Sequence, residues 1–119
     1  MSSISTRILV VDDEPEVGET LKRYLSVRNF QVTTAYNAET ALRMLESHPA
    51  DIVILDILMH GMNGQACARI IKEKYPNTKI MVVTAYPDMA FSLSREITLH
   101  GCFIKPAGIE EIYHKLSNN

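Results

Sequence analysis

Three runs of aliphatic residues stand out along the chain, and none of them alternates with polar residues. They are Ile8–Val11, Ile52–Leu55 and Ile80–Val83. Short continuous aliphatic runs are typical of strands that are covered on both faces, as in a parallel sheet. The shorter run Cys102–Ile104 indicates a fourth strand of this kind, and the mixed segment Phe30–Ala35 is typical of an edge strand.

Between these runs, apolar residues recur at spacings of three and four, as on a helix with one buried face. The stripes are Val17, Leu21, Tyr24 and Leu25; Ala38, Ala41, Leu42 and Leu45; Cys67, Ile70 and Ile71; and Ile109, Ile112, Tyr113 and Leu116. Pro15 and Pro87 suit first helical positions, and Asn37 and Asn63 suit N-caps. The segment Met89–Leu99 is the most loosely periodic. Five alternating strand–helix units predict a doubly wound α/β fold with helices on both faces of the sheet.

Polar residues directly follow four of the aliphatic runs. Asp12 and Asp13 follow the first, Asp56 the second, Thr84 the third and Lys105 the fourth. If the strands are parallel, all five residues emerge at one edge of the sheet, where open α/β folds bind their ligands. A single Asp after a strand is usually a turn or helix-cap residue. The five together favour a functional site.

The mixture of side chains at this edge indicates phosphoryl chemistry. Neighbouring carboxylates raise one another's pKa unless a cation lies between them. Mg²⁺ is the natural cation, because it binds one or two carboxylates and shares phosphate oxygens. An ionised Asp can attack phosphorus, and Lys105 and Thr84 can stabilise phosphoryl oxygens.

Composition narrows the class of protein. The 119 residues fit one domain, residues 1–119, with one core. A net charge of −2 gives no basic field for nucleic acid or an anionic membrane. The aliphatic runs are too short to span a bilayer, and the first residues do not resemble a signal peptide. Cys67 and Cys102 have no CxxC spacing, so we expect reduced, packed thiols and a cytoplasmic setting.

Over nearly its whole length, the chain resembles the receiver domains of two-component response regulators. The resemblance rests on the segments Ile8–Pro15, Asp51–Asp56, Gly61–Gly64, Val83–Ala85 and Lys105–Pro106. It implies a flavodoxin-like (βα)5 three-layer sandwich with parallel strand order 2-1-3-4-5. It also implies a phosphoacceptor domain. The sequence shows no output domain after the receiver segment, so we expect either a single-domain regulator or a receiver taken from a larger protein.

The resemblance assigns roles to the strand-end residues. Asp56 corresponds to the phosphoacceptor, and Asp13 to a direct Mg²⁺ ligand, with Mn²⁺ as a substitute. Asp12 corresponds to a residue that holds the ion or its water. The backbone carbonyl of Leu58 corresponds to a further ligand. Lys105 corresponds to the residue that pairs with the phosphoryl oxygens and the acceptor carboxylate.

The same resemblance extends to the switch residues, with departures. Thr84 corresponds to the hydroxyl that moves toward the phosphate, and the small Ala85 leaves space beside it. The aromatic switch position, three residues before the lysine, holds Cys102, and Phe103 follows it. Either the aromatic switch is absent or the register shifts, and burial of Phe103 in the core is the favoured reading. His60 stands where proline is common, and we interpret it as a solvated loop residue.

The implied function is Mg²⁺-dependent acceptance of a phosphoryl group from a sensor histidine kinase or phosphotransfer protein. Phosphorylation then switches a surface formed by the fourth helix, fifth strand and fifth helix, which binds an output domain or downstream protein. We expect no nucleic-acid or membrane binding by this domain. Some relatives dimerise through the last helices, so the resemblance allows both a monomer and a homodimer.

The expected domain is a binding module and not a turnover enzyme, since it catalyses only its own phosphorylation and dephosphorylation. One alternative is a receiver-like docking module that works without phosphate. An Asp-nucleophile phosphohydrolase is disfavoured, because such enzymes usually carry a second Asp two residues after the nucleophile, where this chain has Leu58. A flavodoxin-like cofactor binder lacks its glycine-rich phosphate loop after the first strand.

Overall fold

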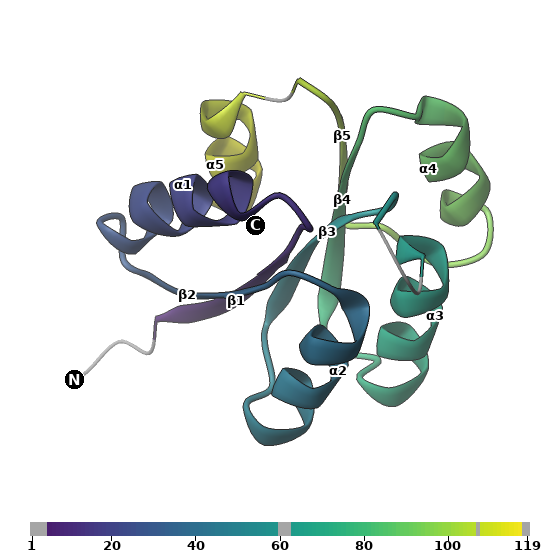
Figure 1. Ribbon diagram of the computed structural model, residues 1–119, viewed down its shortest axis with the longest axis horizontal. Helices are drawn as coiled ribbons and strands as arrows, with labels where there is room; N and C mark the ends of the chain where they lie inside the picture. The colour runs from purple at the N-terminus through teal and green to yellow at the C-terminus, as the bar shows by residue number, and fades with distance from the viewer. Residues whose placement is uncertain (1–4, 60–62, 107, 118–119) are drawn as a thin grey trace.

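Strands and helices alternate strictly along the chain, as the apolar pattern predicts (Figure 1). The structure is a computed structural model that describes residues 5–59, 63–106 and 108–117. The strands are β1 (Thr6–Val11), β2 (Phe30–Ala35), β3 (Ile52–Asp56), β4 (Lys79–Thr84) and β5 (Gly101–Ile104). The helices are α1 (Pro15–Ser26), α2 (Ala38–Ser47), α3 (Gly64–Lys74), α4 (Pro87–Ser94) and α5 (Ile109–Ser117).

The five strands form one parallel sheet in the order β2-β1-β3-β4-β5. Helices α1 and α5 cover one face of this sheet, and α2, α3 and α4 cover the other (Figure 1). The predicted flavodoxin-like, doubly wound three-layer fold is therefore confirmed. So is the prediction that Phe30–Ala35 forms an edge strand.

The continuous aliphatic runs supply the core on both sides of the sheet. Successive side chains of a strand point to opposite faces. In β1, Ile8 and Val10 join the buried cluster beneath α1 and α5, while Leu9 and Val11 join the cluster beneath α2, α3 and α4. A strand buried on both faces needs apolar residues at every position, which explains the absence of alternation.

The helices begin where the sequence signals them. Pro15 and Pro87 lie in the first turns of α1 and α4. The side chain of Asn37 accepts a 2.7 Å hydrogen bond from the backbone N–H of Thr40 at the start of α2. Asn63 caps α3 in the same way, through the N–H of Ala66. Each cap satisfies a backbone donor that the helix itself leaves unpaired.

Strand β5 differs from β4, its neighbour in the sheet, because the described part of the chain leaves one face of β5 exposed. Cys102 pairs in register with Val82 and shares the face of the sheet that α4 lies on, yet Cys102 and Ile104 are both exposed. The prediction of a packed thiol at Cys102 is wrong, since β5 is an edge strand and α4 is only eight residues long. Phe103, on the opposite face, is partly buried and packs against the α1–α5 cluster, so the expected burial in the core is confirmed only in part.

The other thiol behaves as predicted. Cys67 is fully buried, and burial, with the charge of Glu39 adding to it, raises the pKa of its thiol to about 11. A thiol with that pKa stays protonated and inert at neutral pH. Among the described residues, the helices are also too short or too polar to cross a membrane.

Candidate phosphoacceptor site

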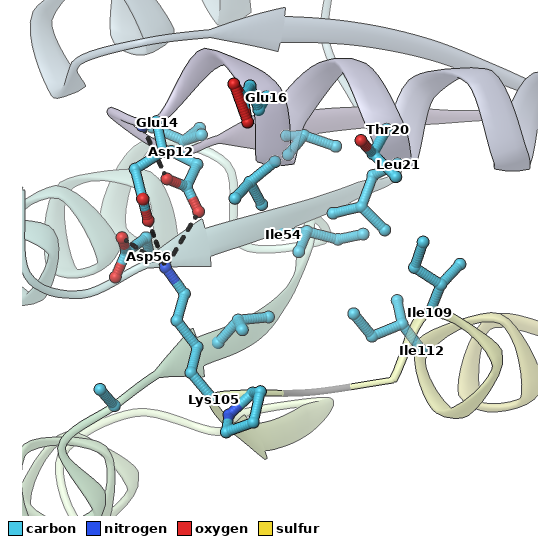
Figure 2. A pocket seen from close by; sticks show the side chains of 16 residues that line it. Asp12, Glu14, Glu16, Thr20, Leu21, Ile54, Asp56, Lys105, Ile109 and Ile112 are labelled. Carbon is cyan, nitrogen blue, oxygen red and sulfur yellow. Dashed lines mark hydrogen bonds and ion pairs between the residues drawn. The ribbon is translucent and has the colours of Figure 1, made fainter.

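The strand-end side chains meet at one edge of the sheet, as the sequence predicts (Figure 2). Asp12 follows β1, Asp56 and Thr84 are the last residues of β3 and β4, and Lys105 follows β5. Hydrogen bonds between neighbouring segments fix these positions. The backbone N–H of Asp12 donates to the carbonyl of Ala35, at 3.1 Å, and that of Lys105 donates to the carbonyl of Thr84, at 2.7 Å.

Lys105 crosses the edge and pairs with three carboxylates. Its ammonium nitrogen lies 3.3 Å from Asp12 Oδ2, 3.2 Å from Asp56 Oδ2 and 3.5 Å from Glu14 Oε1 (Figure 2). Asp12 and Asp56 are almost fully buried, whereas Glu14 is exposed. The lysine therefore neutralises part of a buried negative charge that two separate strands bring together.

Asp12, Asp13 and Asp56 form a group with the chemistry of a magnesium site. One carboxylate oxygen from each lies within 4.8 Å of the others. A hard divalent cation takes oxygen ligands and keeps part of its shell for water and phosphate. Asp13 is partly buried, whereas the other two are buried, so the group opens toward solvent on one side. The residues present fit Mg²⁺.

Burial governs the protonation of the two buried acids. Burial raises the pKa of Asp56, and the nearby charge of Asp12 raises it further; Lys105 and the backbone N–H of Leu58 act in the opposite direction. The pKa of Asp12 is also raised, mainly by burial. At Lys105, burial acts to lower the pKa, but the charges of Asp12 and Asp56 outweigh it and raise the pKa. The ammonium therefore stays charged, while the carboxylates are destabilised in their ionised forms.

The backbone after β3 turns around the carboxylate of Asp56. The N–H of Leu58 donates to Asp56 Oδ1 at 3.2 Å, and the side chain of Leu58 is 48% exposed. Further along, the N–H of Gly64 donates to the carbonyl of Ile57 at 2.6 Å, which ties the start of α3 to this turn. His60 lies outside the described residues.

The predicted switch residues occupy the end of β4. Thr84 is completely buried, and its hydroxyl oxygen accepts a 3.0 Å hydrogen bond from the backbone N–H of Tyr86. Ala85 is exposed and lines the same cavity as Asp56 and Lys105.

The structure separates the two candidates for an aromatic switch. By strand alternation, Thr84 and Cys102 share one face of the sheet, whereas Phe103 lies on the other with the α1–α5 cluster. Phe103 is therefore not on the Thr84 side, and the residue on that side is a cysteine.

Two contacts at the site were not predicted from the sequence. The first is the pairing of Glu14 with Lys105, for which the only signal was that Glu14 directly follows two other acids. The second is the backbone donor of Tyr86 to Thr84. A backbone hydrogen bond leaves no mark in residue types, so only the turn geometry reveals it.

The chain matches known proteins over almost all of its length. The family model described as "Response regulator receiver domain" matches residues 8–117. The response regulator ArlR of Staphylococcus aureus is 30% identical over 112 residues, which cover 93% of this chain and 51% of ArlR. The heme response regulator HssR of Staphylococcus saprophyticus is 36% identical over 77 residues, 65% of this chain and 34% of HssR. The chain thus spans about half or less of these two relatives.

The chain is also similar in fold to a solved structure of a response regulator. The response regulator TrrA of Thermotoga maritima, determined in complex with Mg²⁺ and BeF, is 36% identical. It superposes with a TM-score of 0.83, covering 95% of this chain and 97% of TrrA.

Proposed function

This chain belongs to the response regulator receiver domains of two-component systems, and from that premise we propose that Asp56 is its phosphoacceptor. The donor would be a phosphorylated histidine of a sensor kinase or phosphotransfer protein. One observation carries the proposal. Asp56 is a buried carboxylate held 3.2 Å from the Lys105 ammonium, beside two further carboxylates that can bind a divalent cation.

The reaction that these residues support is a direct transfer. An Asp56 carboxylate oxygen attacks the phosphorus, a P–O bond forms, and the P–N bond to the donor imidazole breaks with its electron pair returning to the ring. Burial destabilises the free carboxylate, so its charge is better accommodated once a cation shares it. The Lys105 ammonium already lies between Asp56 and Asp12 and can follow the developing charge on the phosphoryl oxygens.

The metal would be held by Asp12, Asp13 and Asp56, with the backbone carbonyl of Leu58 as a further ligand. When bound, Mg²⁺ supplies positive charge to the phosphoryl oxygens and reduces repulsion among the carboxylates. The fit of the three carboxylates supports this assignment. The complex of TrrA with Mg²⁺ and BeF supports it by analogy.

Phosphorylation would be read out through Thr84. Its hydroxyl could exchange the Tyr86 N–H for a phosphoryl oxygen, and the neighbouring Ala85 leaves room for that movement. A phosphoryl group at Asp56 would favour the state in which this contact forms, because it interacts differently with the two states. We place the responding surface on α4, β5 and α5, where Phe91 and Ile104 expose apolar side chains to an output domain or partner.

On this proposal the domain is a switch and not an enzyme acting on a metabolite. Its chemistry is limited to gaining and losing its own phosphoryl group. Leu58 occupies the position two residues after the acceptor, where a phosphohydrolase would need a second acid.

Intact-mass measurement after incubation with a small-molecule phosphodonor tests the proposal. Wild type should gain the mass of one phosphoryl group in Mg²⁺ and remain unmodified in EDTA. Asp56→Asn should gain none, whereas Asp88→Asn, which alters an exposed aspartate on α4, should react like wild type.

The result that contradicts the proposal is equally clear. A folded, Mg²⁺-binding wild type that never gains the adduct would indicate a docking module that works without phosphate. An adduct that persists in Asp56→Asn would move the acceptor to another residue.

A further inference from the structure

A cavity of about 590 Å³ extends from the acceptor site between α1 and α5. Its floor is the sheet, at Val10, Ile54 and Val83, and its walls include Leu21 of α1 and Ile112 of α5. Cavities of this size hold organic molecules, and those that do are mostly apolar with a few polar groups at defined points. Phosphoryl transfer needs oxygen ligands and charge but no aliphatic chamber, so the proposed function leaves this cavity unexplained.

The cavity has two chemically different ends (Figure 2). Asp12, Glu14 and Asp56 gather at one end around the ammonium of Lys105. The other end is lined mainly by aliphatic side chains, among them Leu21, Ile109 and Ile112, together with the hydroxyl-bearing side chain of Thr20 on α1.

The acidic end carries an excess of negative charge. Four carboxylates, those of Asp12, Glu14, Glu16 and Asp56, line the cavity, whereas Lys105 is the one cationic side chain among the described lining residues. When all are ionised, these groups sum to −3. Lys105 is already paired with three of the acids, so an anionic ligand would meet repulsion and no free cation.

We propose that this cavity binds a small amphiphilic cation, with its ammonium or amidinium group at the acidic end and its apolar body between α1 and α5. The acidic end favours the cationic group of the ligand, and the aliphatic walls favour its apolar part. The inference does not depend on phosphorylation, since it uses the cavity of the unmodified chain. Such a ligand would lie against Asp56 and hinder access to it.

Three probes, two of similar shape and opposite charge and one shorter, test the proposal on the full chain in metal-free buffer. They are 4-phenylbutylammonium, its anionic counterpart 4-phenylbutanoate, and butylammonium, which lacks the ring. Methyl NMR of Ile54 and Ile112, one on the floor and one on the α5 wall, reports entry into the cavity. We expect saturable shifts with the aryl cation, with a dissociation constant of about 1 mM for a ligand of this size. The anion and the short amine should bind at least tenfold more weakly.

Two substitutions separate the contributions of space and charge. Val17→Phe places a ring in the cavity from α1 and should weaken the binding of the aryl cation at least tenfold. Glu16→Gln removes one of the four negative charges that line the cavity. It should weaken the binding of the aryl cation about two- to fivefold, as expected for an exposed ion pair. Glu46→Gln, an exposed glutamate of α2 away from the cavity, should leave binding unchanged.

Several outcomes would overturn the proposal. These are the absence of shifts at Ile54 and Ile112, equal binding of 4-phenylbutanoate, or full binding to a folded Val17→Phe protein. Tight binding of the anion would assign the cavity to carboxylic acids instead. The probe titration on wild type requires no substitution and no phosphodonor, so its failure is distinct from a failure of phosphorylation.

Discussion

Asp12 and Asp56 are ionisable groups placed where ionisation weakens the fold. Each is buried, and each has a pKa raised above 3.8, chiefly because burial disfavours its charged form. A carboxyl group with a raised folded pKa contributes stability while it is protonated, and that contribution is lost as the pH rises through the folded pKa. At neutral pH the unliganded site is therefore a source of instability that a bound cation relieves.

Asp56→Asn should make the metal-free protein more stable at pH 7.5, because the amide is uncharged and removes repulsion with Asp12. We expect its melting temperature to rise by a few degrees. The difference should shrink as the pH falls, because the raised pKa lets the wild-type carboxyl group take up its proton at a higher pH than an ordinary aspartate does. Thermal unfolding at several pH values measures this, with Asp88→Asn as the exposed control. A melting temperature equal to or below that of wild type at pH 7.5 would contradict the argument.

Leu58 comes two residues after Asp56, Tyr86 comes two residues after Thr84, and these bulky residues are 48% and 50% exposed. Bulky apolar groups beside a reactive intermediate exclude water from it. We expect Leu58→Asn combined with Tyr86→Glu to shorten the lifetime of the phosphorylated form severalfold, measured as loss of the mass adduct after the phosphodonor is removed. Val27→Asn, at an exposed apolar residue after α1, should not change the decay. An unchanged decay rate in the double variant would refute the water-exclusion argument.

The first residue of α3, Gly64, packs directly against the backbone of Asp56 and Ile57. A side-chain carbon at Gly64 would lie 2.5 Å from the carbonyl oxygen of Asp56, against backbone that cannot give way. Gly64→Ala should therefore lower the free energy of unfolding by about 1–3 kcal/mol, the usual range for overpacking. In Gly108→Ala the added carbon meets only the side chain of Glu111, so chemical denaturation should show little change. Equal effects of the two substitutions would exclude a special role for the close approach at Gly64.

The sequence predicted best those strands for which it also indicated that helices cover both faces. Continuous aliphatic runs correctly indicated β1, β3 and β4, because only a strand covered on both faces needs apolar residues throughout. The exposure of the Cys102 thiol was not predicted, because the three-residue run Cys102–Ile104 carries no information about which helix covers it. How far α4 reaches over β5 depends on tertiary packing. Pro87 marked the start of this helix, but the weak periodicity of Met89–Leu99 did not indicate that it ends at Ser94.

The candidate site was predictable to the extent that strand ends define it. Asp12, Asp56, Thr84 and Lys105 follow from the rule that parallel strands present their carboxyl ends at one edge. The cavity between α1 and α5 was not predictable, since it depends on how far apart two helices from opposite ends of the chain settle on the sheet. The acidic residues that line the cavity can be identified in the sequence, but the volume of the cavity cannot.

At the scale of the whole molecule, metal binding should stabilise the fold. Mg²⁺ at ten times its dissociation constant should raise the free energy of unfolding by about 1.4 kcal/mol, provided that it binds only the folded chain. Asp13→Asn should remove most of this gain. Denaturant titrations in Mg²⁺ and in EDTA, with NaCl matching the ionic strength, measure it. Equal stabilisation of wild type and Asp13→Asn would place the metal elsewhere.

Because β5 lies at the end of the sheet, we expect the contacts that Lys105 makes in the site to break and re-form over time. This strand pairs with β4 alone, over four residues, whereas β1 pairs on both sides. Its amide protons should therefore exchange with deuterium sooner than those of β1, through an opening that leaves the first four strands paired. Because Lys105 directly follows β5, each opening would withdraw the cation from Asp12 and Asp56 while both acids stay in place. Asp56, the proposed phosphoacceptor, would thus lose its counter-ion at intervals without the domain unfolding.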